Sequence, residues 1–223
     1  MPQPPLPATA AGLFLAIGCA VAASIAAYRF SSHGAHARRS MHAVAAGGLA
    51  FQVVHVLEHG LQLGFWFAKP GGTPWLSSWA SGTADGLLYF CSLVPSADTP
   101  ASLGVEMLHL TGNIVFLGAL TAWQVAMRAQ NRSIKSLNRA EAVQLFHVAE
   151  HVILVGTLLA LGRANGFSTM FGFVEGSGLV AARVWFHFGI NAIATTYALR
   201  AAHQTWGRKA AVQHPSAEMV LVA

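Results

Sequence analysis

Long apolar stretches constrain the fold of this chain more than any other feature. Five of them are each long enough to cross a lipid bilayer: about 9–28, 41–68, 104–127, 141–162 and 179–201. A run of about 18 or more apolar residues with few charges predicts a transmembrane helix. Only 9% of the residues are charged, whereas soluble domains carry about a quarter. We therefore expect an all-α integral membrane protein with five transmembrane helices.

The first apolar stretch has the length of either a signal peptide or a membrane helix. No Lys or Arg precedes it, whereas a signal peptide normally begins with a positively charged segment. We therefore expect an N-terminal transmembrane helix that forms, with the basic loop after it, a unit of residues 1–40. Residues 41–203 contain the other four spans, and residues 204–223 form a polar tail.

Lys and Arg are unevenly divided between the two sides that these spans define. Ten lie in the loops after the first and third spans or at the C-terminal end, and three lie on the other side: Lys69, Arg163 and Arg183. Because positive charges favour the cytoplasmic side, the N-terminus is expected outside and the C-terminus in the cytoplasm, in the cell (inner) membrane. The net charge of +5 is explained in this way, and no nucleic-acid partner is expected.

The second and fourth spans contain the same polar motif. Residues 52–59 and 144–151 are identical at five of eight positions, and the shared residues include Gln, His, Glu and His. Residues three or four apart share one face of a helix, so each motif predicts a polar stripe. These stripes comprise Gln52, His55, Glu58, His59 and Gln62 in the second span, and Gln144, His147, Glu150 and His151 in the fourth.

The third and fifth spans also share a motif, a His-x-x-x-Asn pattern formed by His109 with Asn113 and by His187 with Asn191. The motifs follow the same order in each half of the chain. The sequence thus predicts two repeated hairpins, residues 41–127 and 141–203, in a pseudo-twofold four-helix bundle. Both hairpins begin on the same side, as in parallel repeats related by an axis along the membrane normal.

The predicted bundle collects ionisable side chains where they are costly. A charged residue at the centre of the bilayer costs about 2.5–3.5 kcal/mol on insertion scales, so such residues indicate a functional site by default. Neutral histidine is the commonest metal ligand, and a cation would neutralise the carboxylates. Two divalent ions are therefore expected, held by His55, Glu58, His59, His109, His147, Glu150, His151 and His187.

The expected ligands are nitrogen and oxygen atoms, because Cys19 and Cys91 are the only cysteines. This set suits iron, manganese, zinc or copper(II), and iron is favoured here because it allows oxygen chemistry. Haem b held by two histidines is the alternative cofactor. The amides Gln52, Asn113, Gln144 and Asn191 are expected to orient the imidazoles by hydrogen bonds.

A membrane metalloprotein with oxidoreductase activity is the favoured function, acting on a lipid, a quinone or a small apolar molecule from the bilayer. Glu58 and Glu150 are the candidate catalytic residues, as bridging ligands or proton carriers. A metal-ion or proton transporter and a haem-binding or metal-binding accessory subunit are the alternatives. Either alternative is compatible with a homo-oligomer or a larger membrane complex.

Three further features lie on the side opposite the cytoplasm. The loop of about residues 69–103 is rich in Gly, Pro, Ser and Trp and predicts a short interfacial helix or a lid. Glu106 is expected at a solvated helix start, one turn before His109, and the alternative is that it joins the site from the outer edge. Arg183 is expected to extend its charged end towards water.

Overall fold

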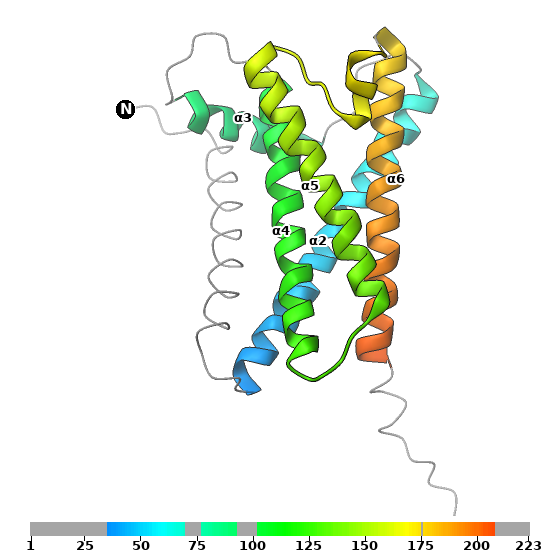
Figure 1. Ribbon diagram of the computed structural model, residues 1–223. Coiled ribbons are helices and arrows are strands. Elements are labelled where there is room, and N and C mark those ends of the chain that lie inside the picture. Colours follow the sequence, from blue (N-terminus) through cyan, green and yellow to red (C-terminus); the bar gives the residue numbers. More distant parts are fainter. Residues whose placement is uncertain (1–34, 70–76, 93–101, 175, 208–223) are drawn as a thin grey trace, which may run out of the picture.

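The computed structural model describes residues 35–69, 77–92, 102–174 and 176–207, and every element in these ranges is helical (Figure 1). The expected first span, about 9–28, and residues 208–223 of the expected tail lie outside the described residues, whereas residues 204–207 of that tail belong to η2. The helices are α2 (Ala35–Ala68), α3 (Ser78–Ser92), α4 (Ser102–Arg128), α5 (Lys135–Leu161), η1 (Phe167–Gly172), α6 (Gly176–Ala202) and η2 (His203–Gly207).

Three of the described helices are long and apolar enough to cross a membrane, namely α2 over Arg39–Ala68, α4 over Leu103–Arg128 and α5 over Lys135–Leu161. This is typical of a membrane protein. Helix α6 has 27 residues, but Arg183, His187 and Asn191 reduce its apolar character. A total of five transmembrane helices remains a prediction.

The helices begin earlier than the apolar stretches that predicted them. Residues 128–140 were expected in a loop, but α5 already starts at Lys135. The apolar stretch indicates only the part of a helix that a bilayer would cover, and the polar residues before it continue the same helix. The connection between α4 and α5 is correspondingly short.

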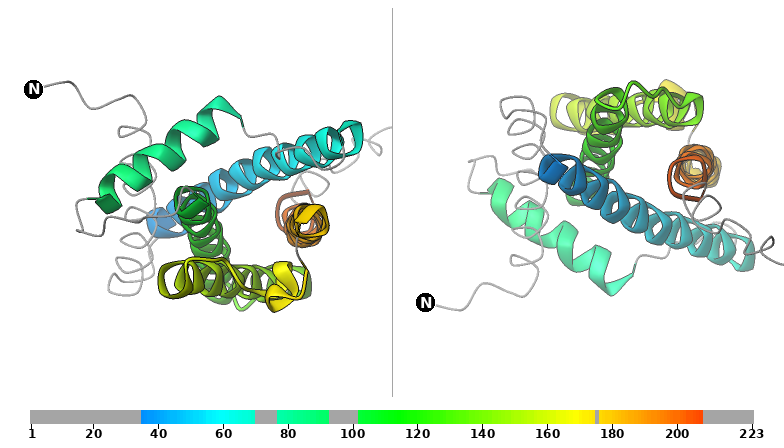
Figure 2. Two further views of the ribbon diagram at one scale, coloured as in Figure 1. Left: turned by 90° about the horizontal axis from the view of Figure 1, so that it is seen from above. Right: turned by 90° about the horizontal axis from the view of Figure 1, so that it is seen from below.

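Four long helices form a closed ring in which α2 packs on α4, α4 on α5, α5 on α6, and α6 on α2. The views along the bundle in Figure 2 show this ring, with α3 on its outside. Helix α3 packs against α4 through Ala80, Ala84, Leu87 and Leu108. The loop expected between the second and third spans therefore contains a helix, α3.

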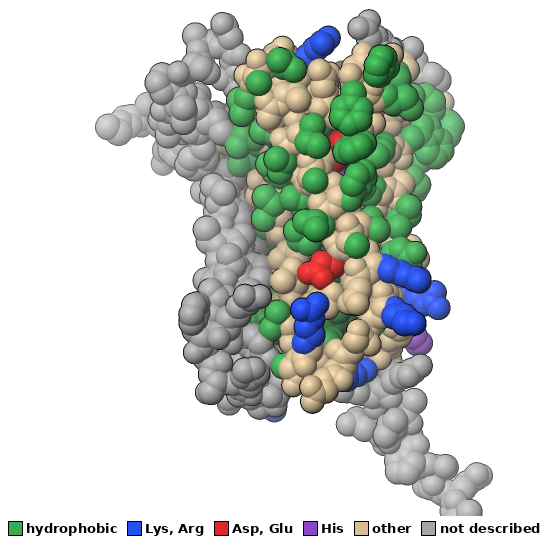
Figure 3. Space-filling view, in the orientation of Figure 1, with side chains coloured by type: hydrophobic (Ala, Val, Ile, Leu, Met, Phe, Trp, Pro, Cys, Tyr) green, Lys and Arg blue, Asp and Glu red, His purple; other side chains and the backbone are tan. Residues whose placement is uncertain are grey.

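One half of the bundle has a closed apolar core. All four ring helices contribute, and the largest buried side chains there include Phe116, Leu120 and Trp123. Trp123 also stacks on Trp206 of η2, with 4.7 Å between ring centroids. Most of the Lys and Arg side chains visible in Figure 3 gather towards this end, near the start of α5 and the end of α6, and one lies at the opposite end.

A layer of buried amides separates the apolar core from the histidines. Gln52 donates to Asn191 Oδ1 at 2.8 Å, and Gln144 donates to Asn113 Oδ1 at 2.7 Å. Both bonds join the hairpin α2–α4 to the hairpin α5–α6. Each ring helix therefore passes through the same three layers: apolar core, amide pair and histidines.

Candidate metal centre

Six histidines lie beyond the amide layer, in two groups of three. His55 and His59 of α2 join His109 of α4, and His147 and His151 of α5 join His187 of α6. Within each group, ring nitrogens lie within 4.8 Å of one another. The structure thus brings together all six histidines that the repeated motifs singled out.

The two groups are neighbours. His109 of the first group stacks on His151 of the second, with ring centroids 5.3 Å apart and planes 5° apart. The rings of His59 and His187 are also close, at 6.1 Å. Ions bound in the two groups would therefore form one dinuclear centre.

In the first group, Nδ1 of two rings is held by a fixed acceptor. His109 Nδ1 donates to the backbone oxygen of Val105, and His59 Nδ1 donates to Gln62 Oε1, both at 2.8 Å. These bonds define the neutral tautomer, because a proton on Nδ1 leaves the lone pair on Nε2. His59 Nε2 lies 3.2 Å from His55 Nε2, so the lone pair points into the group.

The second group shows the same arrangement. His187 Nδ1 donates to the backbone oxygen of Arg183 at 2.8 Å, and His151 Nδ1 donates to Glu106 Oε2 at 3.2 Å. Within the described chain, Nε2 of both rings and both nitrogens of His147 have no hydrogen-bond partner, although all three side chains are buried. Buried, unpaired lone pairs are costly, and a metal ion would satisfy them.

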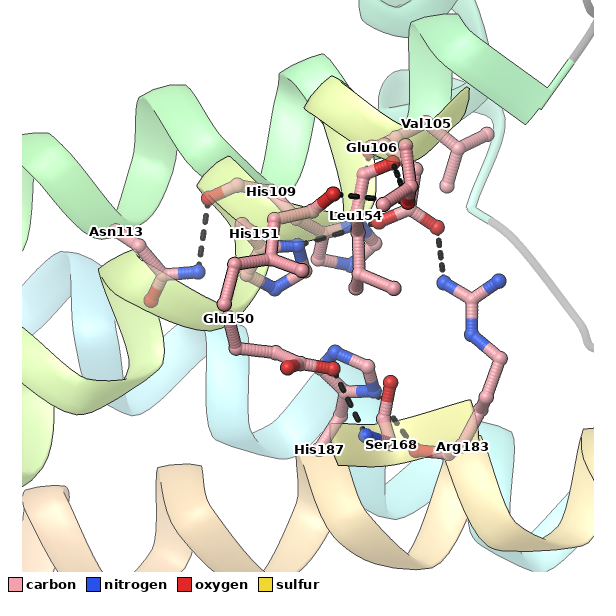
Figure 4. A network of polar contacts seen from close by, with 12 residues as sticks. Val105, Glu106, His109, Asn113, Glu150, His151, Leu154, Ser168, Arg183 and His187 are labelled. Carbon is pink, nitrogen blue, oxygen red and sulfur yellow. Dashed lines mark hydrogen bonds and ion pairs between the residues drawn. The ribbon is translucent and has the colours of Figure 1, made fainter. Parts of the chain in front are cut away.

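Glu106 lies in an environment that its sequence position did not indicate. It was expected in solvent at a helix start, but it is 1% exposed. Figure 4 shows its carboxylate between His151 and Arg183, which forms an ion pair with the other oxygen. Arg183 was expected to reach water and instead neutralises this carboxylate. A carboxylate on the Nδ1–H of a metal-binding histidine fixes the ring and raises its basicity as a ligand.

Glu150, predicted as a ligand and a catalytic residue, is not among the closely spaced ligand atoms of either histidine group. Its two oxygens accept hydrogen bonds from the backbone N–H groups of Phe167 and Ser168, both at 2.8 Å. Figure 4 shows the carboxylate directed at the turn that carries Ser168. The carboxylate therefore holds the segment after α5 through two backbone hydrogen bonds.

Glu58, the other predicted carboxylate, also binds a neighbouring segment. Its Oε1 accepts a hydrogen bond of 2.6 Å from Ser77 Oγ, and Ser77 Oγ accepts one from the Ala80 N–H at 3.1 Å. Ser77 thus caps the start of α3, and Glu58 holds this cap. Neither predicted carboxylate belongs to the groups of closely spaced ligand atoms.

The four amides were expected to orient the imidazoles, and the structure gives them different partners. Gln52 and Gln144 bind Asn191 and Asn113. Each Asn also donates, at 2.8 Å, to the backbone oxygen of the His four residues before it. Instead of the predicted amides, two backbone oxygens, Gln62 and Glu106 orient the rings.

Gly166 gives a direct test of the Glu150 contacts. A Cβ at this position would lie 2.7 and 2.8 Å from the Glu150 oxygens, so Gly166→Ala must displace a buried carboxylate. We expect this change to lower the free energy of unfolding by about 1–3 kcal/mol, measured as a fall in the thermal midpoint in detergent.

The matched control is Gly156→Ala in α5, where an added Cβ meets nothing within 4 Å. Alanine is the better helix former by about 1 kcal/mol, so this variant should melt at or above the wild-type temperature. Equal midpoints for Gly166→Ala and wild type would contradict the assigned role of Glu150.

Comparison with known proteins relates almost the whole chain to one family. A family model described as "Family of unknown function (DUF6008)" matches residues 7–220. No curated protein and no solved structure matches the chain. Any functional inference must therefore rest on the histidine groups themselves.

Proposed function

The chain belongs to the DUF6008 family, and we propose that it is a membrane metalloprotein whose dinuclear centre serves an oxidoreductase reaction. One observation carries the proposal: six histidines form two groups of three, each with ring nitrogens within 4.8 Å. Four of the six rings have Nδ1 held by an acceptor, which leaves Nε2 for a metal.

The ligand set favours copper over the iron expected from the sequence. Neither Glu58 nor Glu150 belongs to the two groups of closely spaced ligand atoms, so each ion would have three neutral imidazoles as its protein ligands. Imidazole suits copper, zinc, iron and nickel, whereas manganese prefers carboxylates, and copper(II) binds nitrogen ligands most tightly among these metals. Copper also supplies the redox chemistry that an oxidoreductase needs.

The location of the histidines supports an enzyme more than a transporter. A transported ion needs a path from both sides, but the half of the bundle beyond the amide layer is filled by buried side chains such as Phe116, Leu120 and Trp123. Haem b is also less favoured. The rings of His109 and His151, from the neighbouring helices α4 and α5, stack with centroids 5.3 Å apart and planes 5° apart, and leave no room between them for a macrocycle.

We further propose that the bundle lies in the cell (inner) membrane with five spans, the N-terminus outside and the C-terminus in the cytoplasm. The Lys and Arg side chains gathered at the apolar end support this orientation. The histidine groups would then lie in the outer half of the membrane. An electron donor or acceptor would reach them there as a quinone, a lipid-soluble molecule or a partner subunit.

Elemental analysis tests the proposal. Protein purified in detergent without chelators is expected to contain about two equivalents of a transition metal, with copper first, and to show no Soret band. The His55→Ala/His147→Ala double variant removes one ligand from each group and should lose most of this metal.

The matched control is His203→Ala, which alters an exposed histidine outside both groups. It should retain the full metal content. Protein without metal would contradict the proposal, and a Soret band would replace it with haem binding. Oxygen consumption with a short-chain quinol then tests the redox assignment, since catalysis should disappear with the metal.

A further inference from the structure

The two histidine groups differ in their surroundings. All three histidines of the second group are buried, whereas His55 and His109 of the first group are partly exposed. The exposure coincides with a cavity of about 340 Å³ between α2, α3 and α4, which these two histidines line. A closed metal site is typical of a structural or supporting role, and a catalytic site keeps one position open.

The cavity has the properties of a small-molecule site. Ligand pockets are mostly apolar, measure about 300–1,000 Å³ and present a few polar groups that orient the ligand. Phe51, Val54, Trp79 and Leu108 provide apolar walls here. The polar side chains of the lining are His55, Glu58, Gln62 and His109, and two of these belong to the first histidine group.

The wall formed by α3 is held in place by Glu58. The carboxylate binds Ser77, and Ser77 caps the helix that brings Trp79 and Ala80 to the cavity. Glu58 itself lines the cavity beside His55. It therefore has two roles available: it positions the wall, and it can accept a hydrogen bond from a ligand.

From these features we propose that this cavity is the substrate site of the dinuclear centre, and that it binds an apolar molecule carrying one hydroxyl group. The hydroxyl would lie against Glu58 and the histidines, and the apolar part against Phe51, Val54 and Trp79. The inference rests on the proposed metal centre for its chemistry, and on the cavity alone for its binding. It also assigns different roles to the two groups: the His55 group meets the substrate, and the His147 group supports it.

A photoactivatable diazirine analogue of 1-decanol tests the binding. Labelled peptides should be concentrated in residues 50–62, 79–80 and 108–112, and an excess of unlabelled decanol should suppress the labelling. In copper-loaded protein, decanol should also change the copper(II) paramagnetic resonance spectrum of the first group. Uniform labelling of the apolar helix surfaces would overturn the proposal, as would an unchanged spectrum at saturating decanol.

Ala50→Phe places a ring in the cavity from an exposed position of α2. It should reduce the labelling at least tenfold. Ala142→Phe is the matched control, because Ala142 occupies the corresponding exposed position of α5 and does not line the cavity. It should leave the labelling unchanged, and an equal reduction in both variants would overturn the proposal.

Metal content measured on the same samples separates the two inferences. Localised labelling of protein that binds no metal would support the cavity as a ligand site and overturn the metal centre, together with the substrate role. Full metal content with uniform labelling would overturn the cavity and leave the metal centre standing.

Discussion

Replacing His151 by alanine is expected to remove one of two metal equivalents and leave the other. His151 belongs to the group with His147 and His187, whereas the other ion would be held by His55, His59 and His109. Two remaining imidazoles bind an ion much more weakly than three, so the second group should be empty after dialysis. Elemental analysis of the dialysed protein measures the result directly.

The complementary variant is His59→Ala, which should empty the first group and spare the second. Under the site assignment above, the decanol-dependent change in the copper spectrum should disappear in His59→Ala and persist in His151→Ala. Loss of both ions from either variant would contradict two independently filled groups. It would indicate instead ligands shared across the pair of rings formed by His109 and His151.

Replacing Glu106 by glutamine is expected to weaken metal binding in the second group by about 10–100-fold, the usual effect of losing such an outer partner. The amide retains the shape of the carboxylate and an acceptor for the His151 N–H, but it removes the charge that makes His151 a better ligand. Titration with a competing chelator measures the change. The first group should keep its affinity, since its histidines are bound by Val105 and Gln62.

The matched variant is Gln62→Leu, which removes the acceptor of His59 Nδ1 and should weaken the first group alone. Glu106→Gln also leaves the partly buried Arg183 without its ion-pair partner, so its thermal midpoint should fall as well. That loss of stability does not by itself test the metal centre. The test is that each variant lowers the metal affinity of a different histidine group. If Glu106→Gln lowered the metal affinity of both groups equally, the role assigned to Glu106 as the partner of His151 would be contradicted.

The repeated motifs made the histidines predictable. Gln, His, Glu and His rarely coincide by chance in apolar helices, and their spacing determines which residues share a face. The structure confirms that His55 and His59 lie near His109, and that His147 and His151 lie near His187. The membrane-length helices could be recognised from the long apolar stretches of the sequence. Helix α5, however, begins in the polar segment that precedes its apolar stretch.

The carboxylates could not be predicted in the same way. Spacing shows which face of a helix a residue occupies, but its partner depends on where other segments pass. Glu150 binds η1, which follows 17 residues later, and Glu58 binds the start of α3. Glu106 carried one recognisable signal, a carboxylate one turn before His109 in an apolar helix. Its burial depends on the ion pair with Arg183, which is 77 residues later in the sequence.

The amide layer also bears on how such a chain is assembled. Gln52 depends on Asn191, and Gln144 depends on Asn113, so each hairpin supplies the acceptor that the other needs. If one hairpin entered the membrane alone, its buried amides would lack their hydrogen-bond partners until the other hairpin packed against it. Neither half therefore satisfies all of its buried amides without the other. We expect the bundle to reach its full stability only after all four ring helices have packed and these two bonds have formed.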